Sequence, residues 1–179
     1  MHAIPNNFLF YFAYGSNLHP YRLKLRVPSS QAVGPALLVG HQLRFHKRGR
    51  DGSGKCNIWR TDNPLDRVIG VVYRMLASEK TLLDNAEGLG RGYQIEELQA
   101  QLLVIDKTKS EQLSFCYVAE LTHIDDTLQP FSWYHDLVVH GARYHGLPAD
   151  YIDQLCKVPS QSDQDFDRHT LHQRILRNL

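Results

Sequence analysis

Residues 8–14 form an aromatic-rich apolar run that ends abruptly at Gly15-Ser16-Asn17. A short apolar run rich in Phe and Tyr is typical of a buried strand. Glycine permits a sharp turn, and serine or asparagine can cap a helix that follows. We expect that helix to cover residues 18–25, with Pro20 in its first turn, where a missing N–H does no harm. The sequence therefore predicts a strand–turn–helix junction.

A junction of this kind directs several unpaired backbone N–H groups toward one point. The first N–H groups of a helix have no partner within it, and the helix dipole favours negative charge at that end. The turn is therefore a candidate seat for an anion such as a carboxylate. On periodicity alone, an ordinary tight turn after a buried strand is the simpler interpretation.

Length and charge limit the class of protein. With 179 residues, the chain is long enough for one domain with its own core, which we assign to residues 1–179. Its 20 Lys and Arg residues nearly balance its 19 Asp and Glu residues, for a net charge of +1. A neutral balance argues against nucleic acid as the main partner. No window approaches the length of a membrane span, so we expect no membrane partner.

The cysteines and the N-terminus indicate the compartment. Cys56, Cys116 and Cys156 are odd in number and far apart, which fits a reducing compartment better than a disulfide framework. The N-terminus lacks the positive region of a signal peptide. We therefore expect a soluble, cytoplasmic protein.

The order of elements predicts the fold class. Helices are expected at residues 77–87, from 132 to about 145, at 149–156 and in a tail at 163–179, which follows a core of about 8–158. Further strands are expected at residues 31–46 (one or two), 56–60, 68–75, 93–105 and 112–121, with a turn at 106–110. Strands come first and helices last, without regular alternation, which indicates an α+β fold.

Two glycine-rich segments imitate nucleotide-binding motifs. Residues 49–55 satisfy most of the P-loop pattern, but Cys56 stands where a hydroxyl is required, and a strand follows instead of a helix. Residues 88–92 follow a helix and precede a strand, the reverse of the dinucleotide-binding order. We reject both motifs and expect residues 49–55 to form a mobile surface loop.

The histidines do not form a metal-binding pattern. His135, His140 and His145 recur every five residues, which spreads them around a helix. His169 and His172 share a face, but no carboxylate or cysteine stands at ligand spacing with them. We expect surface histidines and no metal.

Glu87 ends a predicted helix just before Gly88. An acid there is mildly unfavourable, because the helix C-terminus carries partial negative charge. This placement is a weak indication of function, and a solvated glutamate is the commoner case.

Several segments together resemble the γ-glutamylcyclotransferase family. The string YFAYGSNL resembles the family's hallmark loop, which cradles the substrate's glutamyl end; its residues are Tyr11, Phe12, Ala13, Tyr14, Gly15, Ser16, Asn17 and Leu18. A Leu-Asp-x-x-Glu-Gly segment supplies the family's general base, and Glu87 matches it. Tyr93 follows a glycine-rich turn like the family's, and Tyr117 matches a tyrosine that contacts substrate. Residues 141–151 are similar to the Gly-Leu-Pro-x-x-Tyr signature.

The resemblance extends from about residue 8 to residue 156. It departs at the 49–55 loop and at the histidine-rich tail, which leaves the choice of substrate open. It implies a mixed, barrel-like sheet with peripheral helices. Tyr93 and Tyr117 can equally be ordinary strand aromatics.

The resemblance also implies a reaction. The α-amine of a γ-glutamyl compound attacks its own γ-carbonyl, which closes 5-oxoproline and releases an amine. No protein nucleophile and no cofactor are required, and one carboxylate can serve as base and then as acid. Holding the glutamyl chain folded is worth about 7–11 kcal/mol in favourable intramolecular reactions. If the turn needs a positive φ at Gly15, a β-branched replacement there should raise KM.

Three alternatives remain. A γ-glutamylamine cyclotransferase, acting on γ-glutamyl-lysine-type compounds, would share the loop and Glu87. A non-catalytic ligand-binding module could use the same scaffold. An RNA-binding protein is disfavoured by the neutral charge. The sequence leaves open which γ-glutamyl compound is the substrate and whether the chain forms a homodimer.

Overall fold

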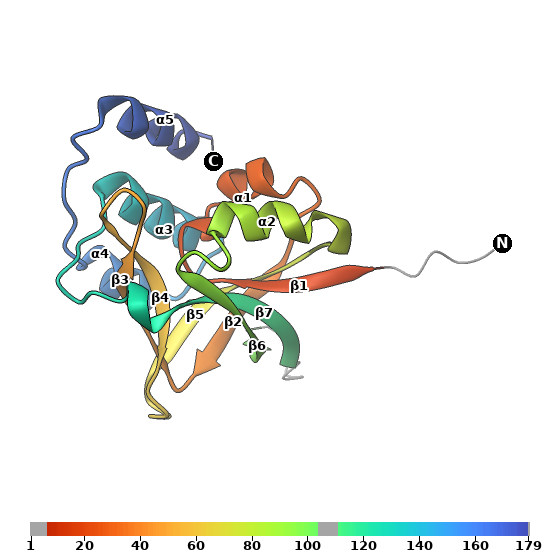
Figure 1. Ribbon diagram of the computed structural model, residues 1–179. Coiled ribbons are helices and arrows are strands. Elements are labelled where there is room, and N and C mark those ends of the chain that lie inside the picture. The colour runs from red at the N-terminus through yellow and green to blue at the C-terminus, as the bar shows by residue number, and fades with distance from the viewer. Residues whose placement is uncertain (1–6, 104–110, 179) are drawn as a thin grey trace.

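The computed structural model describes residues 7–103 and 111–178 and has a closed five-stranded barrel at its centre (Figure 1). Neighbouring strands pair antiparallel, except that β1 and β7 pair in parallel and close the barrel. The order around the barrel is β1 (Phe8–Ala13), β5 (Arg67–Leu76), β2 (Gln31–Val39), β6 (Tyr93–Leu102) and β7 (Glu111–Ala119). The predicted α+β fold with a mixed, barrel-like sheet is confirmed.

A separate antiparallel hairpin consists of β3 (His41–Arg48) and β4 (Gly54–Arg60). The glycine-rich segment at residues 49–55 leads into β4, which begins at Gly54. A P-loop would lead into a helix, so its rejection is confirmed. The expected strands are present with slightly shifted ends. The turn expected at residues 106–110 and the end of the strand expected at 93–105 lie outside the described residues.

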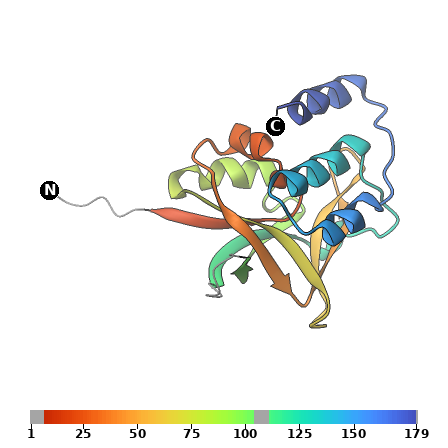
Figure 2. The same cartoon turned by 180° about the vertical axis from the view of Figure 1, so that it is seen from behind.

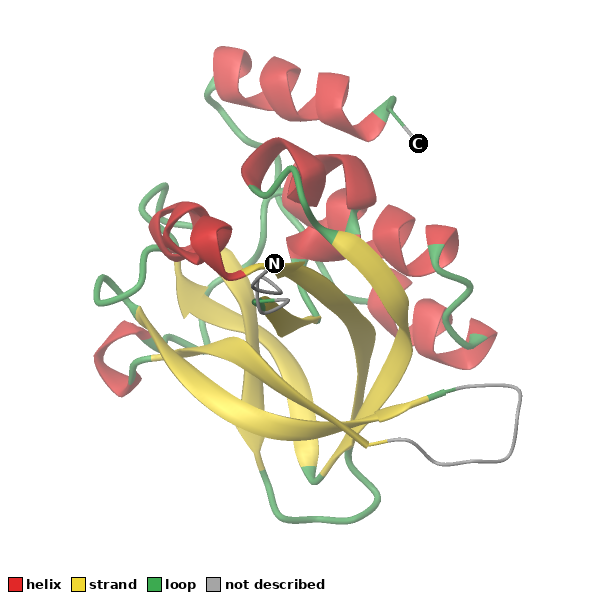
Figure 3. Cartoon of the chain, turned by 90° about the vertical axis from the view of Figure 1, so that its right-hand side faces the viewer, coloured by secondary structure: helices red, strands yellow, loops and turns green. Residues whose placement is uncertain are grey.

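The helices gather toward one end of the barrel, and α5 is the outermost (Figures 1, 2 and 3). The α-helices are α1 (Pro20–Arg26), α2 (Lys80–Glu87), α3 (Ser132–Tyr144), α4 (Ala149–Cys156) and α5 (Phe166–Leu176). Short 3₁₀ helices are η1 (Ser16–Leu18), η2 (Ala77–Glu79) and η3 (Leu121–His123). The helix expected at 77–87 is therefore η2 followed by α2.

Gly88 fixes the end of α2, as predicted. Its φ of +78° is the left-handed conformation that glycine adopts without strain. The N–H groups of Gly88 and Leu89 then bond the Asp84 carbonyl at 2.9 and 3.0 Å. The chain turns away at this point, which leaves Glu87 as the last residue of the helix.

The expected start of the first helix is wrong. Ser16 and Asn17 belong to η1, and α1 begins only at Pro20. The cap of α1 is His19, whose Nδ1 accepts a hydrogen bond from the Arg22 N–H at 3.4 Å. The side chains of Ser16 and Asn17 are therefore available for other contacts.

The C-terminal helix α5 packs against α3 through His172, whose ring stacks on Trp133 with centroids 3.6 Å apart. The tail helix expected from residue 163 begins at Phe166 instead, because the Asp165 side chain caps it by accepting from the Arg168 N–H at 2.9 Å. Two histidines expected at the surface are not there. His135 is buried with its Nε2 2.8 Å from the Leu155 carbonyl, and His172 is held against α3.

Asp163 ties the chain before α5 to α3. Its carboxylate accepts from Trp133 Nε1 at 2.8 Å and pairs with Arg168 at 2.5 Å. The hydrogen bonds from Arg168 are the main reason that the pKa of Asp163 lies well below its usual range. The ionised Asp163 carboxylate therefore stabilises the folded state. This contribution is complete above about pH 4, the pKa of an unfolded Asp, and is lost as the pH falls further.

We therefore expect Asp163→Asn to lower Tm near pH 7 by several degrees, at about 2–4 °C per kcal/mol. The difference from the unaltered chain should narrow near pH 3, because Asp163 then contributes less in that chain too. Thermal unfolding at both pH values checks this. An equal difference at the two pH values would contradict a charge-based role.

Candidate active site

Glu87 is held by two side chains from the segment after β1. Its Oε1 accepts a hydrogen bond from Asn17 Nδ2 at 2.8 Å and forms an ion pair with Arg26 Nη1 at 2.5 Å. Arg26 also donates to Asn17 Oδ1 at 2.8 Å, so the three groups form a closed triangle. The Glu87 side chain is only 16% exposed. The interpretation of Glu87 as a solvated helix end is therefore wrong.

A narrow deep cavity lies beside this triangle. Its volume of about 20 Å³ is enough for roughly one water molecule. Five tyrosines, the η1 turn and Glu87 form most of its wall. The lining residues are Tyr11, Tyr14, Gly15, Ser16, Asn17, Cys56, Glu87, Tyr93, Tyr117 and Tyr134.

The hydroxyls of the predicted tyrosines are fixed by hydrogen bonds. Tyr117 donates to Asp84 Oδ1 at 2.6 Å, and Tyr93 donates to the Cys56 carbonyl at 2.6 Å. Tyr14 donates to the Tyr117 carbonyl, and Tyr11 accepts from Asn17 Nδ2 at 3.0 Å.

Burial keeps this wall uncharged. Burial is the main cause that raises the pKa of all five tyrosines above the usual value, so their hydroxyls are neutral at physiological pH. Burial also raises the pKa of the Cys56 thiol to about 12. A neutral thiol is a poor nucleophile. The wall therefore offers hydrogen bonds and shape, and Glu87 is its ionisable carboxylate.

The structure brings most of the predicted site residues together. Phe12, Ala13 and Leu18 are the exceptions, because they are fully buried in the hydrophobic core and line neither this cavity nor its neighbour. Leu18 packs against α3, where a Cβ added to Gly141 would lie 2.6 Å from the Leu18 Cβ. These three residues support the loop from behind.

Gly15 is needed for space and not for a positive φ. Its φ is −115°, so the expected positive angle is wrong. A Cβ added here would lie 2.9 Å from Cys56 Cβ and 3.3 Å from the Tyr134 hydroxyl. The turn therefore packs directly on β4 and α3.

A wider outer cavity of about 260 Å³ adjoins the deep one and shares Ser16, Glu87, Tyr93 and Tyr134 with it. This volume lies just below the roughly 300–1,000 Å³ of typical ligand pockets, which suits a ligand of a few residues or smaller. Residues 49–51 and Lys55 form part of its wall. The expectation of a surface loop at residues 49–55 is therefore wrong in part, because Ser53 and Gly54 are buried and Gly54 and Lys55 belong to β4.

Three residues of the site were missed in the sequence. Arg22 and Arg26 both line the outer cavity, and their i,i+4 spacing on one helix face was an available signal. Tyr134 lines both cavities, and its hydroxyl accepts from the Cys56 N–H at 3.0 Å. Nothing in the sequence around Tyr134 distinguishes it from other aromatic residues of α3.

The described residues contain no group of three or more His, Cys, Asp or Glu side chains placed to hold a metal ion. Within the same part of the chain, no helix has the length and apolar character needed to cross a membrane.

Comparison with known proteins identifies relatives over most of the chain. The AIG2-like family model matches residues 67–155. The γ-glutamylcyclotransferase of Bos taurus is 31% identical over 153 residues, which cover 83% of this chain and 77% of that protein. The chain belongs to the γ-glutamylcyclotransferase family. Another member, from Mus musculus, is 32% identical over 151 residues, covering 81% of this chain and 76% of that protein.

A solved structure named γ-glutamyl cyclotransferase supports the family assignment. It superposes with a TM-score of 0.80 at 25% identity and covers 93% of this chain and 99% of its own. A crystal structure of an uncharacterized protein from Homo sapiens gives a TM-score of 0.79 at 26% identity, with the same coverage of 93% and 99%.

Proposed function

We propose that this member of the family is an active γ-glutamylcyclotransferase that converts a γ-glutamyl amino acid or peptide into 5-oxoproline and the free amine. The observation that carries the proposal is the position of Glu87. Its carboxylate is oriented by Asn17 and Arg26 where the deep and outer cavities meet. A general base must be held within reach of the proton it takes, and this geometry supplies an oriented carboxylate.

In the proposed reaction, Glu87 takes a proton from the substrate's α-ammonium group. The resulting amine attacks the γ-carbonyl carbon, and a new C–N bond closes the five-membered ring. Glu87 returns its proton to the leaving nitrogen as the bond from that nitrogen to the γ-carbon breaks. The ring nitrogen gives up its second proton to the released amine, which leaves as an ammonium ion. The same carboxylate is therefore base and then acid, without a cofactor or a covalent enzyme intermediate.

The η1 turn is the proposed binding site of the glutamyl α-carboxylate. The intrahelical bonds of η1 begin at Leu18, whose N–H reaches the Gly15 carbonyl at 2.9 Å. The N–H groups of Ser16 and Asn17 precede this bond and have no intrahelical partner. The deep cavity admits only one small group, so the rest of the substrate would lie in the outer cavity. Tyr11, Tyr93, Tyr117 and Tyr134 would enclose the folded glutamyl chain.

An assay with purified protein tests the proposal. We expect 5-oxoproline from γ-glutamyl-alanine, with glutathione and γ-glutamyl-ε-lysine as comparison substrates. The γ-glutamylamine alternative predicts that γ-glutamyl-ε-lysine is the best of the three. A lysine leaving group adds positive charge, which the cationic outer cavity disfavours. Binding without 5-oxoproline from any substrate would favour the non-catalytic alternative.

We also propose a cytoplasmic location. Cys56, Cys116 and Cys156 are all free thiols, which suits a reducing compartment. Association into a homodimer stays a prediction.

A further inference from the structure

The outer cavity is strongly cationic. Two carboxylates, Asp51 and Glu87, line it. Seven cationic side chains line it as well: Arg22, Arg26, Lys47, Arg50, Lys55, Arg91 and Arg168. They come from four separate parts of the fold, namely α1, the β3–β4 hairpin, the turn after α2, and α5. The positive charge is therefore a property of the cavity and not of one element.

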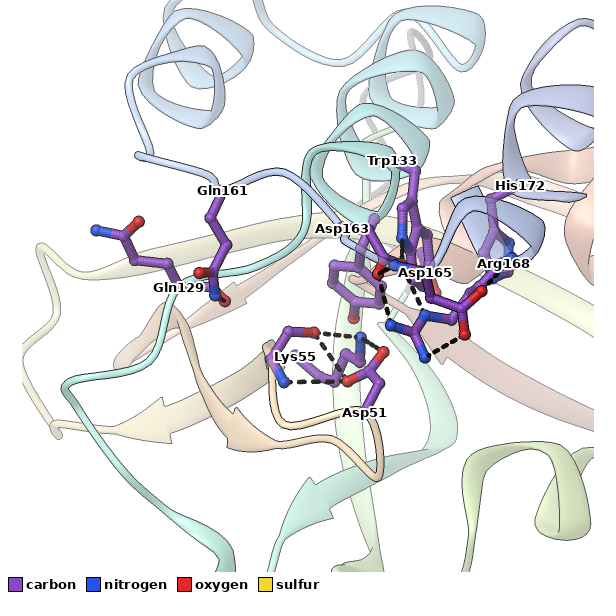
Figure 4. Close-up of polar contacts among 12 residues, drawn as sticks. Asp51, Lys55, Gln129, Trp133, Gln161, Asp163, Asp165, Arg168 and His172 are labelled. Carbon is purple, nitrogen blue, oxygen red and sulfur yellow. Dashed lines mark hydrogen bonds and ion pairs between the residues drawn. The ribbon is translucent and has the colours of Figure 1, made fainter. Parts of the chain in front are cut away.

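Three of these cations already have carboxylate partners. Arg26 pairs with Glu87, as described above. Lys55 pairs with Asp51 at 2.8 Å. Arg168 pairs with Asp163 at 2.5 Å, and Figure 4 shows this pair near Trp133 and the Lys55–Asp51 pair on the hairpin.

Arg22 is a buried guanidinium without a carboxylate partner among the described residues. It is only 9% exposed. Its Nε donates to Ser16 Oγ at 3.2 Å, and its Nη1 lies 3.3 Å from His172 Nδ1. Burial lowers the pKa of His172 to about 3, so this histidine is a neutral acceptor for Arg22. Arg22 lies directly behind the η1 turn, where the glutamyl carboxylate is proposed to bind.

Lys47 is a second buried cation without a carboxylate partner among the described residues. It is 5% exposed, and its Nζ lies 4.4 Å from the centre of the Tyr93 ring. Gly92 packs on it, since an added Cβ there would be 3.0 Å from Lys47 Cε. Arg91 directly precedes Gly92 in the chain, so it lies close to Lys47 in the wall of the same cavity.

Arg50 and Arg91 are exposed at the rim of the cavity. Neither forms an ion pair with another described residue. Leaving buried charges uncompensated costs free energy, so an anion that pairs with Arg22 and Lys47 is favoured. A simple γ-glutamyl amino acid supplies two carboxylates, one for each buried cation. Arg50 and Arg91 then remain for a third.

We propose that the preferred leaving group is an amine with two carboxylates, as in an acidic amino acid, bound by the Lys47 side of the outer cavity with Arg50 and Arg91. This inference rests on the proposed cyclotransferase function. Arg22 stabilises the charge of the glutamyl α-carboxylate from behind the η1 turn. Lys47 pairs with the α-carboxylate of the leaving amino acid, and Arg50 and Arg91 pair with its side-chain carboxylate. Each of these is a charge-assisted contact in a partly desolvated site.

A matched pair of dipeptides tests the preference. γ-Glutamyl-glutamate and γ-glutamyl-glutamine have nearly the same shape and differ in the charge of the second side chain. We expect kcat/KM to be about tenfold or more higher for the glutamate dipeptide, the effect of one charged hydrogen bond. The ratio should shrink when salt is raised from about 0.15 M to about 1 M, because screening shortens the Debye length. Equal kcat/KM values would overturn the inference.

Variants localise the effect. Arg50→Gln and Arg91→Gln should each lower the glutamate-to-glutamine ratio, and the double variant should lower it further. Arg48→Gln is the matched control, because Arg48 lies on the same hairpin but outside the cavity, paired with Asp125 at 3.0 Å. The control should keep the ratio. An unchanged ratio in the rim variants, or an equal fall in the control, would overturn the assignment to the rim arginines.

Direct binding separates this inference from the proposed function. If no γ-glutamyl compound gives 5-oxoproline, the cyclotransferase proposal fails, and calorimetry with the same two dipeptides still measures the charge preference. Tighter binding of γ-glutamyl-glutamate would support the acidic site. Equal affinities would overturn it.

Discussion

Glu87→Gln is expected to lower kcat by a factor on the order of 10² or more, while the substrate still binds. Glutamine keeps the size of the side chain and an oxygen that can accept from Asn17 and Arg26. It cannot take a proton from the α-ammonium group or return one to the leaving nitrogen. The loss should therefore fall on kcat and not on KM. Steady-state kinetics with detection of 5-oxoproline measures both.

Two controls make this result specific. Glu97→Gln removes one carboxylate from an exposed position on β6, away from both cavities, and should turn over normally. Thermal unfolding of Glu87→Gln should show a folded protein, even though the ion pair with Arg26 is weakened. Near-normal turnover in a folded Glu87→Gln variant would remove the catalytic assignment.

Local sequence signals predicted the elements that carry this site. Alternating and apolar runs predicted the strands, and Gly88 predicted where α2 ends. Both are local effects, because strand burial follows periodicity and a left-handed residue after a helix needs glycine. Glu87 could therefore be assigned to a helix end from the sequence alone.

The contacts of Glu87 were not predictable in the same way. Its partner Arg26 is 61 residues away in the chain, and only the packing of α1 beside α2 brings the two together. The same holds for His172, which is far from Trp133 in sequence yet stacks on it. Residues 49–55 are polar and glycine-rich, like many exposed loops, and only the fold brings them to the same cavity as Lys47 and Arg22. Tertiary contact, not local pattern, determines these placements.

Gly15→Ala is expected to lower kcat/KM by a factor on the order of 10², because a displacement of about 1 Å in a positioning loop can cost that much. The added Cβ would lie 2.9 Å from Cys56 Cβ, closer than such atoms approach in practice. Cys56 is buried in a paired strand, β4, so we expect the three-residue η1 turn to move instead. Ser16 and Asn17 would shift with it, and Asn17 would lose its place beside Glu87.

A second substitution separates this steric cause from a conformational one. Cys56→Gly removes the Cβ and Sγ that the new methyl group would meet. In a double-mutant cycle, Gly15→Ala should therefore cost much less in the Cys56→Gly background than in the unaltered chain. Gly15 has a φ of −115°, which alanine can adopt, so no backbone penalty should remain. If Gly15→Ala is equally harmful in both backgrounds, contact with Cys56 is not the reason for glycine. If it is harmless in both, the turn tolerates a side chain, and its close packing on β4 does not position the substrate.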